Sequence, residues 1–405
     1  MIKIEKMIPG GLALATDDSG KKVFFWNALP SEIVLDYTIT KNKSHFSEAI
    51  ATKLDNISSH RIKPKDASYL STSPWQIVDY DYELKLKQSL VVEIFREHKI
   101  TIPTPEIFTD NQDFFYRNKM EYALYWDNDK NQISLAFHAR GSHQKISITN
   151  SSIERPEIFS TAVSIVEDLN ARHEEARKYQ SLLLRCNQKG EVSGGLFENG
   201  KPHPKFKNLT DTILDHEYSY SPNGFFQINL PVYEMALTEI KKHIKTDKVL
   251  DLYSGVGTIG LSVARDKKLT LVECDQSAFD EMVRNITIKD ISRLADNDPT
   301  KSISTANHVQ NDDTLAVLAK SENALDHIES NQTIILDPPR AGCDRRLIDK
   351  LLEVTPAKII YLSCNPATQA RDVSLLLEKY HISAVKTYNF FPRTPHIENL
   401  IVLSL

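Results

Sequence analysis

The chain has 405 residues, of which 41% are hydrophobic and 25% are charged, and its net charge is -5. This length predicts two or three domains, and the composition excludes a largely disordered chain or one embedded in a membrane. The N-terminal stretch MIKIEKMIPGG lacks the apolar core of a signal peptide, so we expect a cytoplasmic protein. The cysteines Cys186, Cys274, Cys343 and Cys364 have no CxxC spacing, which argues against disulfides and against a metal site.

Residues 1–58 alternate short apolar runs with turn signals, such as PGG at residues 9–11 and DDSG at residues 17–20. Short strands at this spacing are typical of a small β-barrel of the oligonucleotide-binding type. The polar and basic stretch that follows, residues 58–68, is interpreted as a linker. We therefore expect an N-terminal barrel that this linker joins to the rest of the chain.

Residues 59–217 mix helical and strand patterns. Apolar residues recur at helical spacing in residues 82–98 and 158–177, whereas residues 119–127 and 132–141 alternate like the two strands of a hairpin. This mixture predicts an α+β central domain.

In residues 218–405, four apolar runs alternate with helical stretches: KVLDLYS, LTLVECD, QTIILDPP and KIIYLSCNP. This pattern predicts a Rossmann-like α/β domain, in which a parallel sheet is covered by helices on both faces. Such folds bind ligands at the carboxyl ends of their strands. We therefore expect the functional site where these four runs end.

A glycine-rich turn follows the first of these strands, in VLDLYSGVGTIGL. Glycines there let the backbone approach a ligand, although an ordinary turn between strand and helix is the alternative. Glu273 ends the next strand, about 20 residues further on, where related folds place a carboxylate against ribose hydroxyls. Asp251 at the first strand end could receive an amino group, which suits S-adenosylmethionine better than a dinucleotide.

The third strand ends at Asp337, in LDPPRAG. The two prolines predict a rigid, extended turn. Arg340 stands where amino-methyltransferases use an aromatic residue, which argues against methylation of nitrogen and favours an anionic or carbonyl-bearing substrate. The alternative is a buried proline turn with an arginine on the surface.

The fourth strand ends at Cys364, and an Asn-Pro turn then opens a helix. Amides at a helix N-terminus lower the pKa of a thiol, so this position suits a nucleophile. A small buried side chain is the alternative. Glu398, between strand-forming residues near the C-terminus, could act as a base with a raised pKa, or equally form a surface ion pair.

Five motifs occur together: NGFFQIN, DLYSGVGTIGL, LDPPRAG, YLSCNPATQARD and FPRTPHIEN. In this order they resemble S-adenosylmethionine-dependent RNA (uracil-C5)-methyltransferases, the family of the 23S rRNA and tRNA 5-methyluridine enzymes. The resemblance covers almost the whole chain. It implies an RNA-binding TRAM barrel in residues 1–58, a central domain in residues 59–217 and a methyltransferase domain in residues 218–405.

The resemblance also implies roles for single residues. Cys364 resembles the nucleophile of the family and Glu398 its general base. The residues that resemble the cofactor-binding set are Gln227, Tyr253, Thr258, Glu273 and Asp337, together with Asp312 or Asp313, between which the sequence does not choose. Thr258 replaces an asparagine that is found in some relatives.

One departure from the family concerns iron. Many relatives hold an iron–sulfur cluster through cysteines after the barrel, but this chain has no cysteine before Cys186, so we expect no cluster. Residues 71–73, Ser-Thr-Ser, stand where such ligands would be. Packing must then hold this segment.

The implied activity is methylation of C5 of a specific uridine in RNA by S-adenosylmethionine, in a monomeric enzyme without membrane contact. The TRAM-like barrel favours 23S rRNA, and tRNA uridine 54 is the alternative target. Other readings are a methyltransferase that acts on nitrogen, which would not need Cys364, and a non-catalytic RNA-binding protein. The basic residues that are candidates for RNA contact, or for plain solvated surface, are Lys41, Lys43, Arg61, Lys63, Lys65, Arg117 and Lys119.

Overall fold

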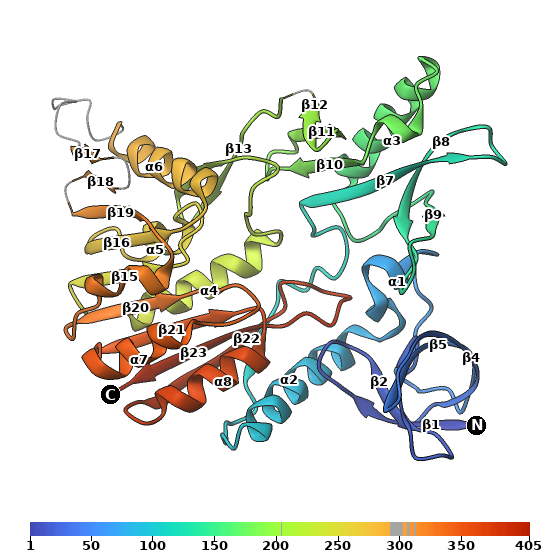
Figure 1. Ribbon diagram of the computed structural model, residues 1–405, viewed down its shortest axis with the longest axis horizontal. Coiled ribbons are helices and arrows are strands. Elements are labelled where there is room, and N and C mark those ends of the chain that lie inside the picture. Colours follow the sequence, from blue (N-terminus) through green and yellow to red (C-terminus); the bar gives the residue numbers. More distant parts are fainter. Residues whose placement is uncertain (204, 292–302, 306–307, 312) are drawn as a thin grey trace.

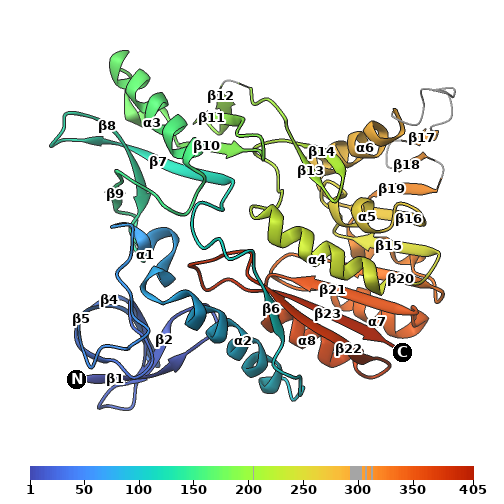
Figure 2. The ribbon, with the colours of Figure 1, turned by 180° about the vertical axis from the view of Figure 1, so that it is seen from behind.

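The computed structural model describes residues 1–203, 205–291, 303–305, 308–311 and 313–405. The N-terminal barrel, a middle sheet with its helix α3 and the large C-terminal sheet occupy three corners of the molecule (Figures 1 and 2). No helix in these described ranges is long and apolar enough to cross a membrane.

Five strands form the N-terminal barrel, which closes in the order β1-β2-β3-β5-β4. They are β1 (Ile2–Met7), β2 (Ala13–Thr16), β3 (Lys22–Trp26), β4 (Ile33–Asn42) and β5 (Phe46–Asp55). In β1, Ile2 and Ile4 point inward while Lys3 and Glu5 are exposed, as the period of a strand requires. The predicted barrel is confirmed, and its identity as a TRAM domain stays a prediction.

The stretch interpreted as a linker, residues 58–68, is bonded to both of the regions that it joins. Arg61 pairs with the buried Glu32 of the barrel, with 2.7 Å between Nε and Oε1, and its backbone bridges to Val78. Further along, the carboxylate of Asp66 is only 2% exposed. Sequence composition could not reveal these partners because they lie far away along the chain.

Asp66 is a hub of hydrogen bonds. Its carboxylate accepts from Gln76 Nε2 at 2.8 Å, from Asn150 Nδ2 at 3.1 Å and from the hydroxyl and backbone N–H of Ser152 at 2.7 and 3.0 Å. Gln76 also donates to Ser73 Oγ at 2.7 Å. Polar bonding therefore holds the segment around residues 71–73, which forms α1 (Tyr69–Thr72) and η1 (Pro74–Ile77).

We expect Asp66→Ala to lower the free energy of unfolding by about 3 kcal/mol. The variant leaves without a partner several buried donors that bond to the charged carboxylate in the wild type. Urea denaturation of the purified protein measures this. Asp18→Ala, at an exposed turn, is the matched control and should change the value by less than about 0.5 kcal/mol. Equal losses in the two variants would contradict the role of Asp66.

The middle sheet has six strands in the order β12-β11-β10-β7-β8-β9, and α3 (Pro156–Ala171) packs on it. The strands are β7 (Lys119–Asp127), β8 (Gln132–His138), β9 (Lys145–Ser147), β10 (Ser181–Cys186), β11 (Val192–Glu198) and β12 (Lys201–His203). The hairpin and the helix predicted here are confirmed. The short helix η2 (Ala176–Lys178) and a separate hairpin, β13 (Leu209–Ile213) with β14 (His216–Tyr220), complete this region.

The C-terminal sheet has ten strands in the order β17-β18-β19-β16-β15-β20-β21-β23-β22-β6. Strands β19, β16, β15, β20 and β21 run parallel, and β23 is antiparallel to both of its neighbours. The strands are β15 (Lys248–Leu252), β16 (Lys268–Glu273), β17 (Ile303–Thr305), β18 (His308–Asn311), β19 (Thr314–Leu318), β20 (Gln332–Leu336), β21 (Lys358–Ser363), β22 (His381–Tyr388) and β23 (Glu398–Ser404).

Helices cover both faces of this sheet, which confirms the predicted α/β fold. In β21, Ile359 and Tyr361 belong to the core on one face, whereas Ile360 and Leu362 belong to the core on the other. The helices are α4 (Leu230–His243), α5 (Thr258–Val263), α6 (Gln276–Ile291), η4 (Ser321–Asn323), η5 (Leu325–His327), α7 (Arg345–Val354) and α8 (Pro366–Leu376).

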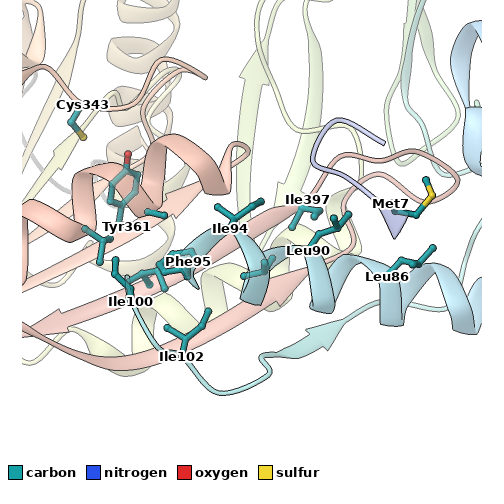
Figure 3. Packing of buried hydrophobic residues seen from close by; sticks show 14 of the residues in the cluster. Met7, Leu86, Leu90, Ile94, Phe95, Ile100, Ile102, Cys343, Tyr361 and Ile397 are labelled. Carbon is teal, nitrogen blue, oxygen red and sulfur yellow. The ribbon is translucent and has the colours of Figure 1, made fainter. Parts of the chain in front are cut away.

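Helix α2 (Tyr80–Glu97) joins the barrel to the C-terminal sheet. Figure 3 shows Leu86 and Leu90 beside Met7 of the barrel, and Phe95 of the same helix on the side of Tyr361. Immediately after this helix, β6 (Glu106–Phe108) pairs in parallel with β22. The boundary between residues 59–217 and 218–405 stays a prediction, but the two ranges share one sheet and one core.

A loop of the barrel also contacts the segment that leads to Glu398. Gly11 has φ +89°, and a Cβ built on it would lie 2.2 Å from Cβ of Pro395, so only glycine fits. Trp75 Nε1 donates to Gly11 O at 3.1 Å. The barrel is thus docked beside the C-terminal part of the predicted site.

Candidate active site

Three of the predicted site residues lie at the same edge of the C-terminal sheet. The final residue pairs of β15, β16 and β20 are level in the parallel ladder. The residues at or just beyond these ends, Tyr253, Glu273 and Asp337, therefore lie at the carboxyl edge, where open α/β sheets bind their ligands. The structure thus brings these three residues to one edge of the sheet, and the role of that edge as the site stays a prediction.

The glycine turn and Glu273 are bonded to each other. Glu273 Oε2 accepts from the N–H of Gly255 at 2.8 Å, and its Oε1 accepts from the N–H groups of Cys274 and Asp275, both at 2.7 Å. Gly255 has φ +56°, and a Cβ placed on it would meet no atom within 4 Å. The backbone turn thus has open space above it, beside a carboxylate that is held in place.

Asp251 does not reach this space, and the expectation that it receives an amino group was wrong. Its side chain is fully buried, and its Oδ2 accepts from the N–H of Gly260 at 2.8 Å while Oδ1 has no partner. Burial raises the pKa of Asp251 to about 8. This aspartate therefore supports the start of α5 from inside the sheet.

The raised pKa of Asp251 predicts a pH-dependent stability. Between pH ~4 and pH ~8 the folded chain holds a proton on Asp251 that the unfolded chain releases, so the free energy of unfolding falls as pH rises through this window. We expect Asp251→Asn to remove about 1.4 kcal/mol per pH unit from that slope, because asparagine stays neutral and still offers an oxygen to Gly260. Urea denaturation at several pH values measures the slope. Asp18→Asn is the exposed control, and an unchanged slope in Asp251→Asn would contradict the assignment.

Cys364 and Glu398 come together through the antiparallel pairing of β21 with β23. Ser363 pairs with Asn399. Continuing this register by one residue sets Cys364 opposite Glu398, and opposite residues of an antiparallel pair have Cβ atoms about 4.5–5.5 Å apart on one face. Glu398 is 3% exposed. The structure thus places a thiol beside a buried carboxyl group.

These two groups share their surroundings with Asp337 and Arg340. Burial, Glu398 and Asp337 raise the pKa of the Cys364 thiol to about 11, while Arg340 acts in the opposite direction. Burial raises the pKa of Asp337 to about 7. Burial and Asp337 likewise raise the pKa of Glu398 well above its usual range. The expectation that helix amides lower the thiol pKa was wrong, because burial and two neighbouring acids dominate.

The turn that carries Arg340 is bonded to the turn that carries Cys364. The carbonyl oxygen of Arg340 accepts from Asn365 Nδ2 at 2.8 Å and from Thr368 Oγ1 at 3.2 Å. Asn365 also caps α8, since its Oδ1 accepts from the N–H of Ala367 at 3.2 Å. The two sequence motifs therefore form one local structure that keeps the guanidinium near the thiol.

A cavity of about 210 Å³ opens beside Cys364. Its walls come from five parts of the chain: the barrel loop, helix α2, the turn at Arg340, the turn at Cys364 and the segment before Glu398. The residues are Pro9, Gly10, Leu90, Ile94, Arg340, Cys364, Asn365, Pro366, Ala367, Pro395, His396 and Ile397. Sequence reasoning missed the barrel loop, α2 and His396. Only the last carried a signal, since it lies within the FPRTPHIEN motif.

Gln227 and Thr258 lie around α4. Gln227 precedes this helix, is 9% exposed, and its carbonyl oxygen accepts from Asn118 Nδ2 at 3.0 Å. Thr258 begins α5, is buried, and bonds through its side chain to Tyr233 of α4. The role of Thr258 in ligand contact stays a prediction.

Asp313 is not brought to the site. It precedes β19, which runs parallel to β16, so Asp313 lies at the amino edge of the sheet, opposite the edge of Glu273. Asp312 lies outside the described residues. Two residues that follow β19 lie at the carboxyl edge instead. The N–H of Ala319 donates to the carbonyl oxygen of Glu273 at 2.9 Å, and Ser321 bonds to the Tyr253 side chain. Sequence reasoning missed these because it could not locate the start of β19.

The basic residues that are candidates for RNA contact differ in their surroundings. Lys43 and Lys63 are exposed, whereas Arg61 is bonded to Glu32. Lys119 Nζ donates to the carbonyl oxygens of Asn223 and Gly224 at 2.9 and 3.1 Å. Arg61 and Lys119 thus have structural partners already. No group of three or more His, Cys, Asp or Glu side chains in the part of the chain that the structure describes is placed to hold a metal ion.

Residues 208–405 match the model of a family described as tRNA (uracil-5-)-methyltransferase. These residues, just under half of the chain, are thus similar to a family of RNA methyltransferases. An uncharacterized RNA methyltransferase of Prochlorococcus marinus is 29% identical to it over 420 residues, which cover 89% of this chain and 96% of that protein. Another, of Staphylococcus aureus, is 26% identical over 443 residues, which cover 95% and 93%.

Among solved structures, the methyltransferase resembles the Pyrococcus abyssi tRNA (uracil-54, C5)-methyltransferase in complex with S-adenosyl-L-homocysteine. The TM-score is 0.75 and the identity 21%, and the match covers 100% of both chains. The likeness shows that the two proteins share their fold over the whole length, the barrel included. The range that matches the family model, residues 208–405, includes the candidate site residues from Tyr253 to Glu398.

Proposed function

We propose that this RNA methyltransferase transfers a methyl group from S-adenosylmethionine to C5 of a uridine in RNA, with Cys364 as nucleophile and Glu398 as base. The observation that carries the proposal is the register of β21 with β23, which sets the thiol opposite a buried carboxyl group. A methyltransferase that acts on nitrogen does not need a nucleophilic thiol. A protein that only binds RNA needs neither Cys364 nor Glu398 for catalysis.

The residues at the sheet edge fit S-adenosylmethionine. Glu273 offers a carboxylate for ribose hydroxyls, and the turn at Gly255 leaves space for a ligand. Asp337 suits a cationic group, since a positive charge nearby would relieve the raised pKa of this acid. Gln227, Tyr253 and Thr258 complete the proposed set. When bound, this cofactor supplies the methyl group as an electrophile.

The chemistry needs a nucleophile because C5 of uracil is too weak to take a methyl group directly. The Cys364 thiolate forms a bond to C6, and the electrons displaced from the ring double bond make C5 nucleophilic. After C5 has gained the methyl group, Glu398 in its ionised form, which its raised pKa makes a stronger base, accepts the C5 proton, and the released electron pair restores the double bond and expels the thiolate. The enzyme ends with its cysteine free.

Formation of the thiolate depends on the charges nearby. Arg340 already lowers the pKa of Cys364, and neutralisation of Asp337 by a cation would remove a second obstacle. Both effects favour the thiolate that the proposed reaction needs.

Two RNA molecules are candidate substrates. The TRAM-like barrel led us to favour 23S rRNA, whereas the matching family and the Pyrococcus abyssi protein are named for tRNA. Because that archaeal protein shares the fold with its barrel, the barrel alone does not separate the two substrates. The target base must leave any helix to reach the site, which favours a loop in either RNA.

The test is to incubate the purified protein with labelled S-adenosylmethionine and unmodified transcripts of 23S rRNA or tRNA, and to look for 5-methyluridine by mass spectrometry. Label in one RNA identifies the substrate. Label in tRNA alone makes uridine 54 the first position to map. Absence of 5-methyluridine from both, in protein shown to bind the cofactor, would contradict the proposal.

A further inference from the structure

A second cavity, of about 380 Å³, lies where the first turns of α3 and α4 face the end of β10. It shares no residue with the cavity beside Cys364. Four segments line it: residues 110–118, residues 155–157 at the start of α3, residues 186–188 after β10, and residues 228–231 at the start of α4. The proposed chemistry makes no use of this space.

Several polar side chains that line this cavity have atoms without partners. Asn118 Oδ1 and both polar side-chain atoms of Asn229 are enclosed and have no hydrogen-bond partner, and Glu157, whose side chain is 39% exposed, adds a further unpartnered oxygen, Oε2. Asn118 is 4% exposed and Asn229 2%. An unsatisfied buried group costs about 1–3 kcal/mol, so these atoms are available to bind a polar ligand in the cavity.

The other atoms of these side chains are already bonded, which limits how far the groups can turn away. Asn118 Nδ2 donates to the carbonyl oxygen of Gln227 at 3.0 Å. Glu157 Oε1 accepts from Arg155 NH2 at 2.7 Å. The cluster therefore holds three acceptor oxygens, on Asn118, Asn229 and Glu157, and a single donor, the Asn229 amide nitrogen.

This set matches the hydrogen-bonding edge of guanine. Guanine presents three N–H donors, one on N1 and two on its exocyclic amino group, beside one acceptor, O6. Adenine and cytosine offer a single amino group, and uracil a single ring N–H between two carbonyls. Phe115, an aromatic side chain that is 42% exposed, also lines the cavity and can stack on a base.

The cavity is connected to the proposed site through two contacts. Asn118 bonds to Gln227, a member of the proposed cofactor set, and Tyr116 Oη donates to the carbonyl oxygen of Pro392 at 3.0 Å, in the segment before Glu398. On these grounds, and resting on the proposed action on RNA, we propose that this cavity binds an unpaired guanine base of the substrate close to the methylated uridine.

The variant Asn229→Ala tests the site without removing any hydrogen bond that its side chain makes in the free protein. We expect the KM for RNA to rise ~10-fold or more, with kcat at saturating RNA and the melting temperature unchanged. Asn223→Ala, an exposed asparagine six residues earlier, is the matched control and should leave KM unchanged. An unchanged KM in Asn229→Ala would overturn the proposal.

A second experiment changes the RNA instead of the protein. Inosine lacks the amino group of guanine, so replacing the critical guanosine by inosine should weaken binding to the wild type ~10-fold and barely affect Asn229→Ala. If inosine at every unpaired guanosine leaves binding unchanged, the proposal fails. Inhibition by free guanosine monophosphate, with no effect of inosine in RNA, would assign the cavity to a free nucleotide instead. Because this arm measures binding by gel shift, it stands even if no RNA is methylated.

Discussion

Cys364→Ala is expected to abolish the formation of 5-methyluridine while the affinity for S-adenosylmethionine stays within about twofold of the wild type. The proposed reaction begins with a bond between this sulfur and C6, and no other described thiol lies near Glu398 and Asp337. Mass spectrometry of digested RNA measures the product, and calorimetry measures cofactor binding.

Two further variants make this result specific. Cys364→Ser keeps nearly the size and polarity of the side chain but offers a far poorer nucleophile, so it should also be inactive. Ser374→Ala, on the exposed side of α8, should keep wild-type activity. Methylation by Cys364→Ala at the wild-type rate would refute the covalent mechanism and favour a reaction that needs no thiol.

Glu398→Gln is expected to accumulate a covalent complex between protein and RNA, with turnover reduced by ~10²–10⁴-fold. Without the base the C5 proton stays in place, so the thiolate cannot be expelled from C6. The substitution should not harm folding, because glutamine has the shape of glutamate and burial already favours the uncharged form of this side chain. A denaturing gel shows the complex as a band that nuclease removes.

The double variant Glu398→Gln with Cys364→Ala is the decisive control. It lacks the sulfur that joins the two molecules, so the slow band should be absent. A band that persists in the double variant would place the bond on another residue. Full turnover in Glu398→Gln, without any band, would remove Glu398 from the role of base.

Much of the local structure could be predicted because it depends on neighbours along the chain. Apolar residues at helical spacing identified α2 and α3, and alternation identified the hairpin of β7 and β8. Apolar strand patterns that end in polar or turn residues placed Glu273 and Asp337 at one edge. Parallel strands make that inference safe, since their carboxyl ends share an edge.

Other parts could not be predicted because they depend on partners far away in sequence. Asp251 stands next to the glycine turn, yet packing on both faces of the sheet buries it completely. Asp313 lies in a stretch of polar residues near a strand, and only the start and direction of β19 show that it is at the wrong edge. In the sequence, Asp66 lies in a polar stretch that we interpreted as a linker. Only the structure shows that residues 150–152 bond to it.

By itself the sequence determined the types of the elements, the shared sheet edge of Glu273 and Asp337 and the kinds of side chain gathered there, because these follow from local periodicity and from motifs. The tertiary structure alone decided that Cys364 faces Glu398, since that depends on the antiparallel insertion of β23 between β21 and β22. It also decided that α2 and a barrel loop wall the cavity beside the thiol. Strand order and register are set by the burial of whole faces, which no single segment encodes.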